Sequence, residues 1–127
     1  MNGKERVLKT LSFEEVDRTP WVPYAGVQAA NLIGVTAEEY LKNEDNIVNG
    51  VLKAFEKYKP DGLPVCFDLQ VEAEALGCKL KWAKENPPAV MTHILQEKKV
   101  QDLSLPKETD GRYPIMLKAA RRLSQLI

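Results

Sequence analysis

Residues 60–77 read PDGLPVCFDLQVEAEALG, and this stretch decides the fold class. A turn, PDG, leads into the apolar run 63–67, which is typical of a strand that is covered on both faces of a sheet. Residues 70–76 favour a helix that ends at Gly77. Asp68 follows the predicted strand directly, and α/β barrels carry their chemistry at the carboxyl ends of their strands. The stretch therefore predicts an α/β fold in which one acidic residue, Asp68, lies at the carboxyl end of a strand, where catalytic residues of α/β barrels are found.

Before this stretch, the sequence predicts a short helix and an irregular strand. Asn2 and Glu5 form an N-terminal capping signal for a short amphipathic helix. Residues 21–24 are apolar and favour a strand, but Pro23 interrupts them. We therefore expect this first strand to be short or irregular.

Three helical segments are predicted between these two strands. Residues 28–33 are predicted to form a helical turn that ends at Gly34. A capping box that begins at Thr36 predicts a helix over residues 37–43. Residues 46–59 repeat apolar side chains at steps of three and four, which is the clearest helix pattern in the chain.

The second half of the chain predicts a peripheral strand and a last helix. Residues 78–84 alternate apolar side chains with lysines, as in an amphipathic strand on the outside of a molecule. A helix begins near Pro114, and its wide apolar face needs a sheet to cover. Because this pattern runs to Ile127 without a cap, we expect the chain to be the first part of something larger. No repeat or linker divides it, so residues 1–127 are predicted to form a single, incomplete domain.

Composition excludes several classes of function. The 127 residues include 18 basic and 18 acidic side chains, so no net field attracts nucleic acid or an anionic membrane. The N-terminus lacks the apolar core of a signal peptide, and no apolar run approaches the thickness of a bilayer. We therefore expect a cytoplasmic protein. Cys66 and Cys78 form no CxxC pair, which favours reduced thiols over a disulfide framework.

Asp68 is the candidate catalytic residue of this chain. A carboxylate that is half-buried at a strand end has a pKa that desolvation and neighbouring charges can tune. The alternative is a capping role, in which Asp68 satisfies free amides of the helix predicted over 70–76, and on the residues alone this alternative is favoured. Glu72 and Glu74 are interpreted as solvated charges on that helix.

His93 and Arg18 are interpreted as structural residues. No Cys, Asp or Glu stands at metal-ligand spacing from His93. Arg18 is expected to pair with Asp17 or to cap the preceding helix, rather than to bind a substrate carboxylate. The chain contains no GxGxxG, P-loop, GxSxG or HExxH motif, so nucleotide binding, phosphoryl transfer, serine hydrolysis and zincin chemistry have no support.

Several short motifs follow one another along the chain in a recognisable order and spacing. They are Lys4-Glu5-Arg6-Val7-Leu8, Val16-Asp17-Arg18-Thr19-Pro20, Asp61-Gly62, Glu74-Ala75-Leu76-Gly77-Cys78, Val100-Gln101-Asp102-Leu103 and Asp110-Gly111-Arg112-Tyr113-Pro114-Ile115. Taken together, the chain resembles the N-terminal part of the uroporphyrinogen decarboxylase superfamily. It is most similar to the branch of methylcobalamin-dependent methyltransferases that act on coenzyme M.

The resemblance implies a partial (β/α)₈ TIM barrel. This chain would supply the N-terminal helices, the first two barrel strands and a peripheral hairpin, and a barrel takes about 250 residues to close. The open sheet edge and the uncovered helix faces would need the remainder of the barrel or a homo-oligomer partner. We therefore expect the 127-residue chain to be inactive in isolation.

The resemblance also implies a role for Asp68, which stands nine residues before Gly77. In the decarboxylases, the matching aspartate contacts the pyrrole nitrogens and stabilises the protonated intermediate. Those enzymes bind substrate carboxylates through arginines after the first strand, where this chain has Tyr24-Ala25-Gly26-Val27-Gln28. The missing arginines make a highly carboxylated porphyrinogen a poor substrate.

The methyltransferase branch implies different cofactors and partners. Its members bind zinc through His and Cys residues in the C-terminal part of the barrel, and the zinc activates a thiol that takes a methyl group from a corrinoid. Cys66, Cys78 and His93 do not replace those ligands, so the resemblance places zinc outside this chain and adds a corrinoid protein as a partner.

The leading hypothesis is an N-terminal fragment of a corrinoid-dependent methyltransferase of this family. One alternative is decarboxylation of uroporphyrinogen III in tetrapyrrole biosynthesis, in which case no cofactor is needed. Another is a complete, small, non-catalytic interaction module. Whether the chain by itself is an enzyme stays open at this point.

Overall fold

The computed structural model describes all 127 residues. In chain order, the elements are α1 (Gly3–Leu11), α2 (Gln28–Ile33), α3 (Ala37–Leu41), α4 (Glu44–Tyr58), α5 (Val71–Ala75), β1 (Lys79–Lys81), β2 (Ala89–Thr92), the 3₁₀ helices η1 (Ile94–Gln96) and η2 (Val100–Asp102), and α6 (Tyr113–Leu126). No helix combines the length and the apolar character that crossing a membrane requires.

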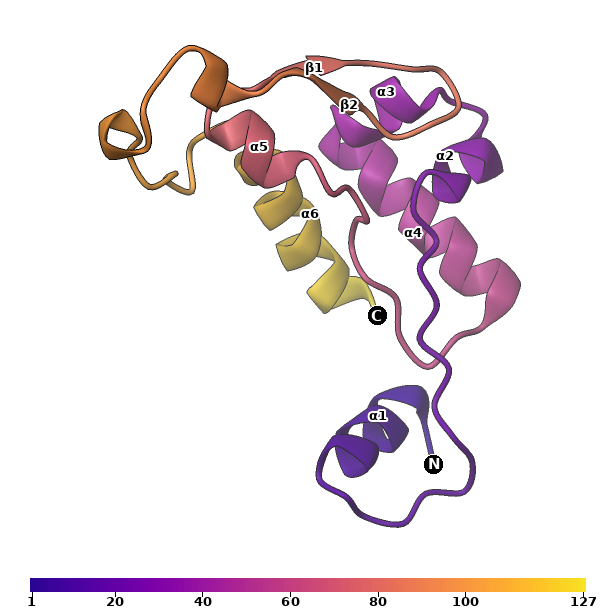
Figure 1. Cartoon of the computed structure of the whole chain (residues 1–127). Helices are drawn as coiled ribbons and strands as arrows, with labels where there is room; N and C mark the ends of the chain where they lie inside the picture. The colour runs from indigo at the N-terminus through magenta and orange to yellow at the C-terminus, as the bar shows by residue number, and fades with distance from the viewer.

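The core lies between α4 and the helices that pack on it, α2, α3 and α6 (Figure 1). Its buried members are Ala29, Ala30, Tyr40, Leu41, Ile47, Val48, Val51, Ala119 and Leu123. Gly50 allows the close approach of α2 to α4, because a Cβ there would lie 2.6 Å from the Tyr40 ring and 3.0 Å from the Ala29 carbonyl oxygen. Helix α6 therefore packs on α4 through Ala119 and Leu123, and not on the sheet that its face was predicted to need.

Two of the predicted helix starts are confirmed by their capping boxes. Capping boxes form at Asn2 with Glu5 and at Thr36 with Glu39. The helix predicted over 46–59 begins two residues earlier, at Glu44, because the Asn43 side chain accepts a hydrogen bond from the Asn46 amide. Because Asn43 is the N-cap of α4, α3 ends at Leu41 and does not reach residue 43.

The two predicted barrel strands, 21–24 and 63–67, do not form strands in the structure. The two segments run in the same direction (Figure 1), but no backbone hydrogen bond joins residues 21–24 to residues 63–67. The nearest one runs from the amide of Asp61, before the second segment, to the Trp21 carbonyl. Prolines 23 and 64 remove one donor from each segment, and neither segment has a hydrogen-bonded neighbour on its other edge. Further along, the ring centres of Tyr24 and Phe67 lie 4.7 Å apart, with the ring planes tilted by 42°.

The only sheet is the antiparallel hairpin of β1 and β2. The strand predicted over 78–84 is confirmed, but it is shorter and occupies Lys79–Lys81. Leu80 pairs with Val90 and Lys81 with Ala89, and a bulge separates Lys79 from Leu80. The hairpin lies at the edge of the molecule, over the end of the helical core that contains α3 (Figure 1).

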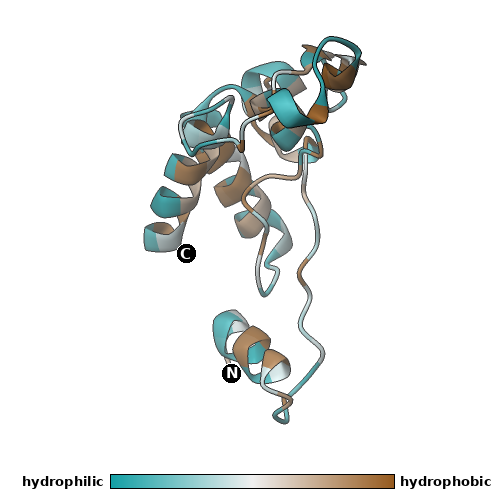
Figure 2. Cartoon of the chain, turned by 60° about the vertical axis from the view of Figure 1, so that its left-hand side comes forward, coloured by the Kyte–Doolittle hydropathy of each residue, from teal (hydrophilic) through white to brown (hydrophobic).

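Helix α1 stands apart from the helical core (Figures 1 and 2). Its apolar residues are largely exposed: Leu8 is 54% and Leu11 71% exposed, and Phe13, just after it, is 99% exposed. Charged contacts at Asp61 attach α1 to the rest of the chain. Gly3 lies directly against this residue, where a Cβ would approach the Asp61 Cα to 2.8 Å.

Candidate functional site

The candidate site forms where the segment 63–67 ends and α6 begins. Asp68 lies between that segment and α5, and Arg112 directly precedes α6. The Arg112 Nη2 atom lies 2.6 Å from the Asp68 Oδ2 atom. The two side chains are 5% and 0% exposed, so this is a buried ion pair. The two atoms do not meet in hydrogen-bond alignment, so the contact is primarily electrostatic.

A glycine turn brings Arg112 to this place. Gly111 has a φ of +52°, in the left-handed region that favours glycine. A Cβ at Gly111 would also lie 3.3 Å from the Ala75 amide nitrogen, tighter than an ordinary contact. The start of α6 is therefore pressed against α5, and the side chain after the turn enters the interior.

Arg112 contacts three further elements, and we call Asp68, Glu74, Trp82 and Arg112 the Arg112 cluster. Its Nε donates to Glu74 Oε2 in α5 at 2.6 Å, and its Nη1 donates to the Leu41 carbonyl of α3 at 3.3 Å. Its guanidinium carbon lies 4.8 Å from the centre of the Trp82 ring. The interpretation of Glu74 as a solvated charge was wrong, because its carboxylate is bound to Arg112 and is 23% exposed.

The other oxygen of Asp68 has a local partner. Asp68 Oδ1 accepts a hydrogen bond from the Gln70 amide at 2.9 Å, just before α5 begins at Val71. This contact is close to the capping role that the sequence favoured. The amide that Asp68 binds, however, lies in the turn before α5 and not in the first turn of the helix. The remaining prediction, that Asp68 is a catalytic residue, concerns a carboxylate that is fully enclosed in this structure.

The cysteines and the histidine do not assemble a metal site. Burial, together with the nearby negative charge of Asp68, raises the pKa of the Cys66 thiol to about 12. Cys78 is buried and free. His93 Nδ1 accepts from the Leu95 amide and so caps η1. No group of three or more His, Cys, Asp or Glu residues lies close enough to hold a metal, so the residues of this chain do not fit zinc.

A second group of charges, Arg6, Asp17, Arg18 and Asp61, forms what we call the N-terminal ion cluster. Arg18 Nη1 lies 2.7 Å from Asp61 Oδ2, so the expected pairing of Arg18 with Asp17 was wrong. Asp17 pairs instead with Arg6, whose Nε lies 2.6 Å from Asp17 Oδ1. Arg6 is buried and also binds Asp61.

Asp61 is the centre of this cluster. Besides the two arginines, it accepts a hydrogen bond from the Trp21 amide at 2.8 Å. The hydrogen bond from Arg18, followed by that from the Trp21 amide, lowers the pKa of Asp61 to about 2. The hydrogen bond from Arg6 likewise holds the pKa of Asp17 well below its usual range. The cluster therefore attaches α1 to the starts of both extended segments.

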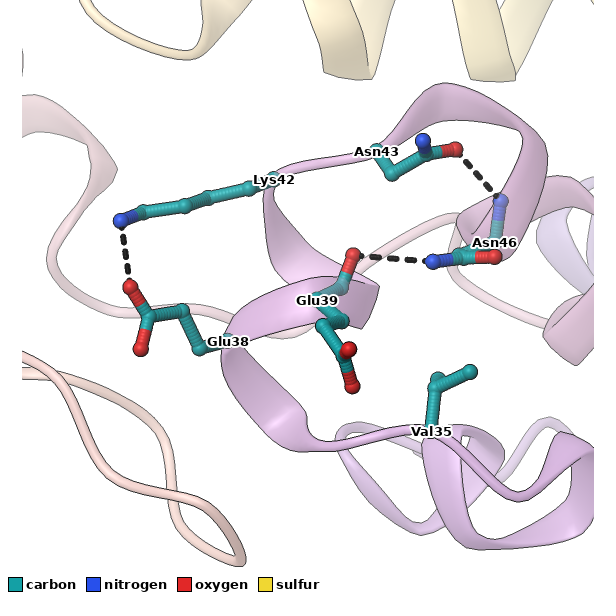
Figure 3. A pocket seen from close by; sticks show the side chains of 6 residues that line it. All are labelled: Val35, Glu38, Glu39, Lys42, Asn43 and Asn46. Carbon is teal, nitrogen blue, oxygen red and sulfur yellow. Dashed lines mark hydrogen bonds and ion pairs between the residues drawn. The ribbon is translucent and has the colours of Figure 1, made fainter.

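A hollow in the surface lies elsewhere, where α3 meets α4. It has a volume of about 480 Å³ and is lined by Val35, Glu38, Glu39, Lys42, Asn43 and Asn46 (Figure 3). Its polar groups bind one another: Lys42 Nζ lies 2.6 Å from Glu38 Oε1, and the Asn46 side chain donates to the Glu39 carbonyl. These contacts serve the helix ends, so the hollow shows no converging free groups for a ligand.

Sequence reasoning missed Arg112, Arg6 and Asp61 as organising residues. Each stands in one of the short motifs quoted above, yet its partner lies in a distant motif or outside the motifs altogether. The available signal was the Asp110-Gly111 turn directly before Arg112, since glycine favours the positive φ that the structure has there.

Comparison with known proteins identifies the class of protein to which this arrangement belongs. The family model for uroporphyrinogen decarboxylase (URO-D) matches residues 2–127, and the chain belongs to this family. The resemblance inferred from the sequence is thereby confirmed. No protein of curated function matches the chain.

Among solved structures, the chain is similar to a methyltransferase from Methanosarcina mazei. The TM-score is 0.86 at 24% sequence identity, and the match covers 100% of this chain and 39% of the methyltransferase. At this identity the likeness shows the fold alone. The chain thus spans well under half of the length of that methyltransferase.

Proposed function

We propose that this chain forms the N-terminal part of a (β/α)₈ barrel in a corrinoid-dependent methyltransferase, and that it has no turnover by itself. The observation that carries the proposal is the buried ion pair of Asp68 and Arg112. This ion pair bears on whether the chain is part of a methyltransferase or of a decarboxylase.

A decarboxylase would need the negative charge of Asp68 for a protonated pyrrole intermediate. Here the guanidinium of Arg112 lies 2.6 Å from that carboxylate and already offsets its charge inside the fold. A cation placed beside the pair would meet an arginine as well as an aspartate, which weakens the stabilisation that the decarboxylase chemistry requires.

The chain also lacks free arginines near the first extended segment that could bind a polycarboxylate substrate. Arg6 and Arg18, the arginines nearest the first extended segment, are bound to Asp17 and Asp61. The loop that follows that segment carries none, since residues 24–28 contain no basic side chain. The name of the similar M. mazei protein, a methyltransferase, agrees with this choice of branch.

In the proposed barrel, the parallel segments 21–24 and 63–67 are the first two strands. Their free edges would be completed by the remainder of the barrel or by a homo-oligomer partner. Zinc, which activates a thiol in this branch, would be bound by residues outside this chain, since the residues here do not fit it. A corrinoid protein would be the methyl donor, and the cytoplasm the compartment.

Asp68 keeps its place as the candidate catalytic residue of this part of the barrel. An ionised carboxylate has about four acceptor positions, and the hydrogen bond from the Gln70 amide occupies one of them. Because the side chain has no exposed surface, contact with a substrate requires a movement of the residues around it.

The test is a chimera in which this chain replaces the matching part of the M. mazei methyltransferase. Methyl transfer from methylcobalamin to coenzyme M would be followed by the absorbance of the demethylated corrinoid, and uroporphyrinogen decarboxylation would be assayed in parallel. We expect methyl transfer by the chimera, none by the 127-residue chain, and no decarboxylation. Decarboxylation without methyl transfer would overturn the proposal and restore the decarboxylase alternative.

A further inference from the structure

Four elements of the fold meet at one guanidinium group. Arg112 binds Asp68 at the end of the second extended segment, Glu74 in α5 and the Leu41 carbonyl at the end of α3. Its planar face lies over Trp82, which follows β1 in the hairpin. Each contact uses a different part of the group: Nη2, Nε, Nη1 and the face of the plane.

Only arginine provides this set of contacts. Its five N–H donors lie in one rigid plane, and that plane also stacks on aromatic rings, whereas lysine offers a single flexible point charge. The Arg112 side chain is 5% exposed, so water does not replace a contact that is lost. Lys42 Nζ, from the C-cap of α3, also lies over the Trp82 ring, at 4.3 Å from its centre.

The orientation of the Asp68 carboxylate depends on this arrangement. Its Oδ1 is held by the Gln70 amide and its Oδ2 by Arg112. With both oxygens held, the plane of the carboxylate is set. With Arg112 removed, one oxygen would be buried without a partner of opposite charge.

We propose that Arg112 is the positioning residue for Asp68, and that it acts by fixing both the place and the plane of this carboxylate. The proposal rests on the proposed function, because a positioned carboxylate matters for activity only if the chain is part of an enzyme. The contact itself is testable without activity.

The first experiment uses the 127-residue chain and the side-chain NMR signals of its arginines. A guanidinium that is bound on several sides rotates slowly about its Nε–Cζ bond, so its Nη nitrogens give separate signals. We expect separate Nη signals for Arg112 and faster exchange between them in Asp68→Asn, while the signals of the control residue Arg122 stay unchanged. Arg122 is a matched control because it lies on α6 and pairs with Glu44 and Asp45 at a partly exposed site. Unchanged Arg112 signals in Asp68→Asn would overturn the proposal.

The second experiment uses the chimeric methyltransferase. We expect Arg112→Lys to lower kcat at least tenfold with KM within twofold, and Arg122→Lys to change neither. The double variant Asp68→Asn/Arg112→Lys is expected to be no slower than Asp68→Asn alone, because the two residues act as a unit. Losses that multiply in the double variant would overturn the proposal.

A further variant covers the case in which Arg112→Lys fails to fold. Asp68→Glu keeps the charge but moves the carboxylate by one methylene, so we expect turnover to fall at least tenfold. Full activity of Asp68→Glu would contradict a need for precise placement. If the unmodified chimera shows no methyl transfer, the proposed function fails, and the NMR experiment alone decides whether Arg112 positions Asp68.

Discussion

At the scale of single residues, two arginines with buried partners organise this chain. Arg6 and Arg112 are 6% and 4% exposed, and each binds carboxylates from distant parts of the sequence. A buried ion pair adds little net stability when it is intact, but removing one partner leaves an uncompensated charge in the interior. The effect of a substitution therefore depends on which arginine is changed.

Replacing Arg112 should be far more destabilising than replacing Arg122. We expect Arg112→Met to lower the free energy of unfolding by about 3–5 kcal/mol, because Asp68 would stay buried without its cation. Arg122→Met, which loses only exposed pairs, should cost about 0–1 kcal/mol. Urea unfolding followed by circular dichroism measures both. Equal losses for the two variants would show that the Arg112 pair is not buried in solution.

The N-terminal ion cluster should respond to acid. The pKa of Asp61 is about 2 in the folded chain, below the value of about 3.9 of an unperturbed aspartate. A lowered pKa stabilises the folded state fully above pH 4, and this contribution is lost as the pH falls towards 2. The ¹³C signal of the Asp61 carboxyl should titrate near pH 2, and the attachment of α1 should weaken over the same range. Titration near pH 4 in the folded chain would contradict the cluster.

The Cys66 thiol should be unreactive in the folded chain. Its pKa is raised to about 12 by burial and by the charge of Asp68, so almost no thiolate is present at pH 8. In a Cys78→Ser variant, we expect slow reaction with a chromogenic disulfide reagent at pH 8 and rapid reaction in urea. Rapid reaction without urea would show that Cys66 is a thiolate or is exposed.

At the scale of elements, the sequence predicted helices well and strands poorly. Helix starts depend on caps such as Asn2 and Thr36, whose signals lie within three residues, and these were confirmed. A strand depends on neighbours, and Pro64 within the predicted strand 63–67 was a signal against a regular ladder. The Arg112 cluster was beyond local reasoning, because its contacts join four elements that only the folded chain brings together.

The packing of α2 on α4 should depend on Gly50. Alanine normally stabilises a helix interior relative to glycine, but here its Cβ would lie 2.6 Å from the Tyr40 ring. We expect Gly50→Ala to lower the free energy of unfolding by about 1–3 kcal/mol through overpacking. The control is Asn49→Ala, at an exposed position of the same helix, which should be neutral or stabilising. A stabilising Gly50→Ala would show that the two helices are further apart.

At the scale of the whole molecule, the exposed surface is too large for the mass. The chain exposes 8545 Å² at 14.3 kDa, whereas a compact monomer of this mass exposes about 6,800 Å². The excess of roughly 1,700 Å² is about twice the area of about 800 Å² that one partner buries in a standard protein interface. Exposed apolar side chains such as Phe13 and Leu105, 99% and 92% exposed, form part of that surface.

This surface should be covered when the rest of a barrel is supplied. We expect the 127-residue chain to bind an apolar dye such as ANS, and to lose that binding when it is co-expressed with the part of the M. mazei methyltransferase that it does not match. The two polypeptides should co-purify in equal amounts, because the free edge of the segment 63–67 and the face of α6 can then be buried. An equivalent piece of an unrelated barrel is the control. Loss of dye binding by self-association alone would instead favour a homo-oligomer, and a monomer without dye binding would favour the small interaction module that the sequence left open.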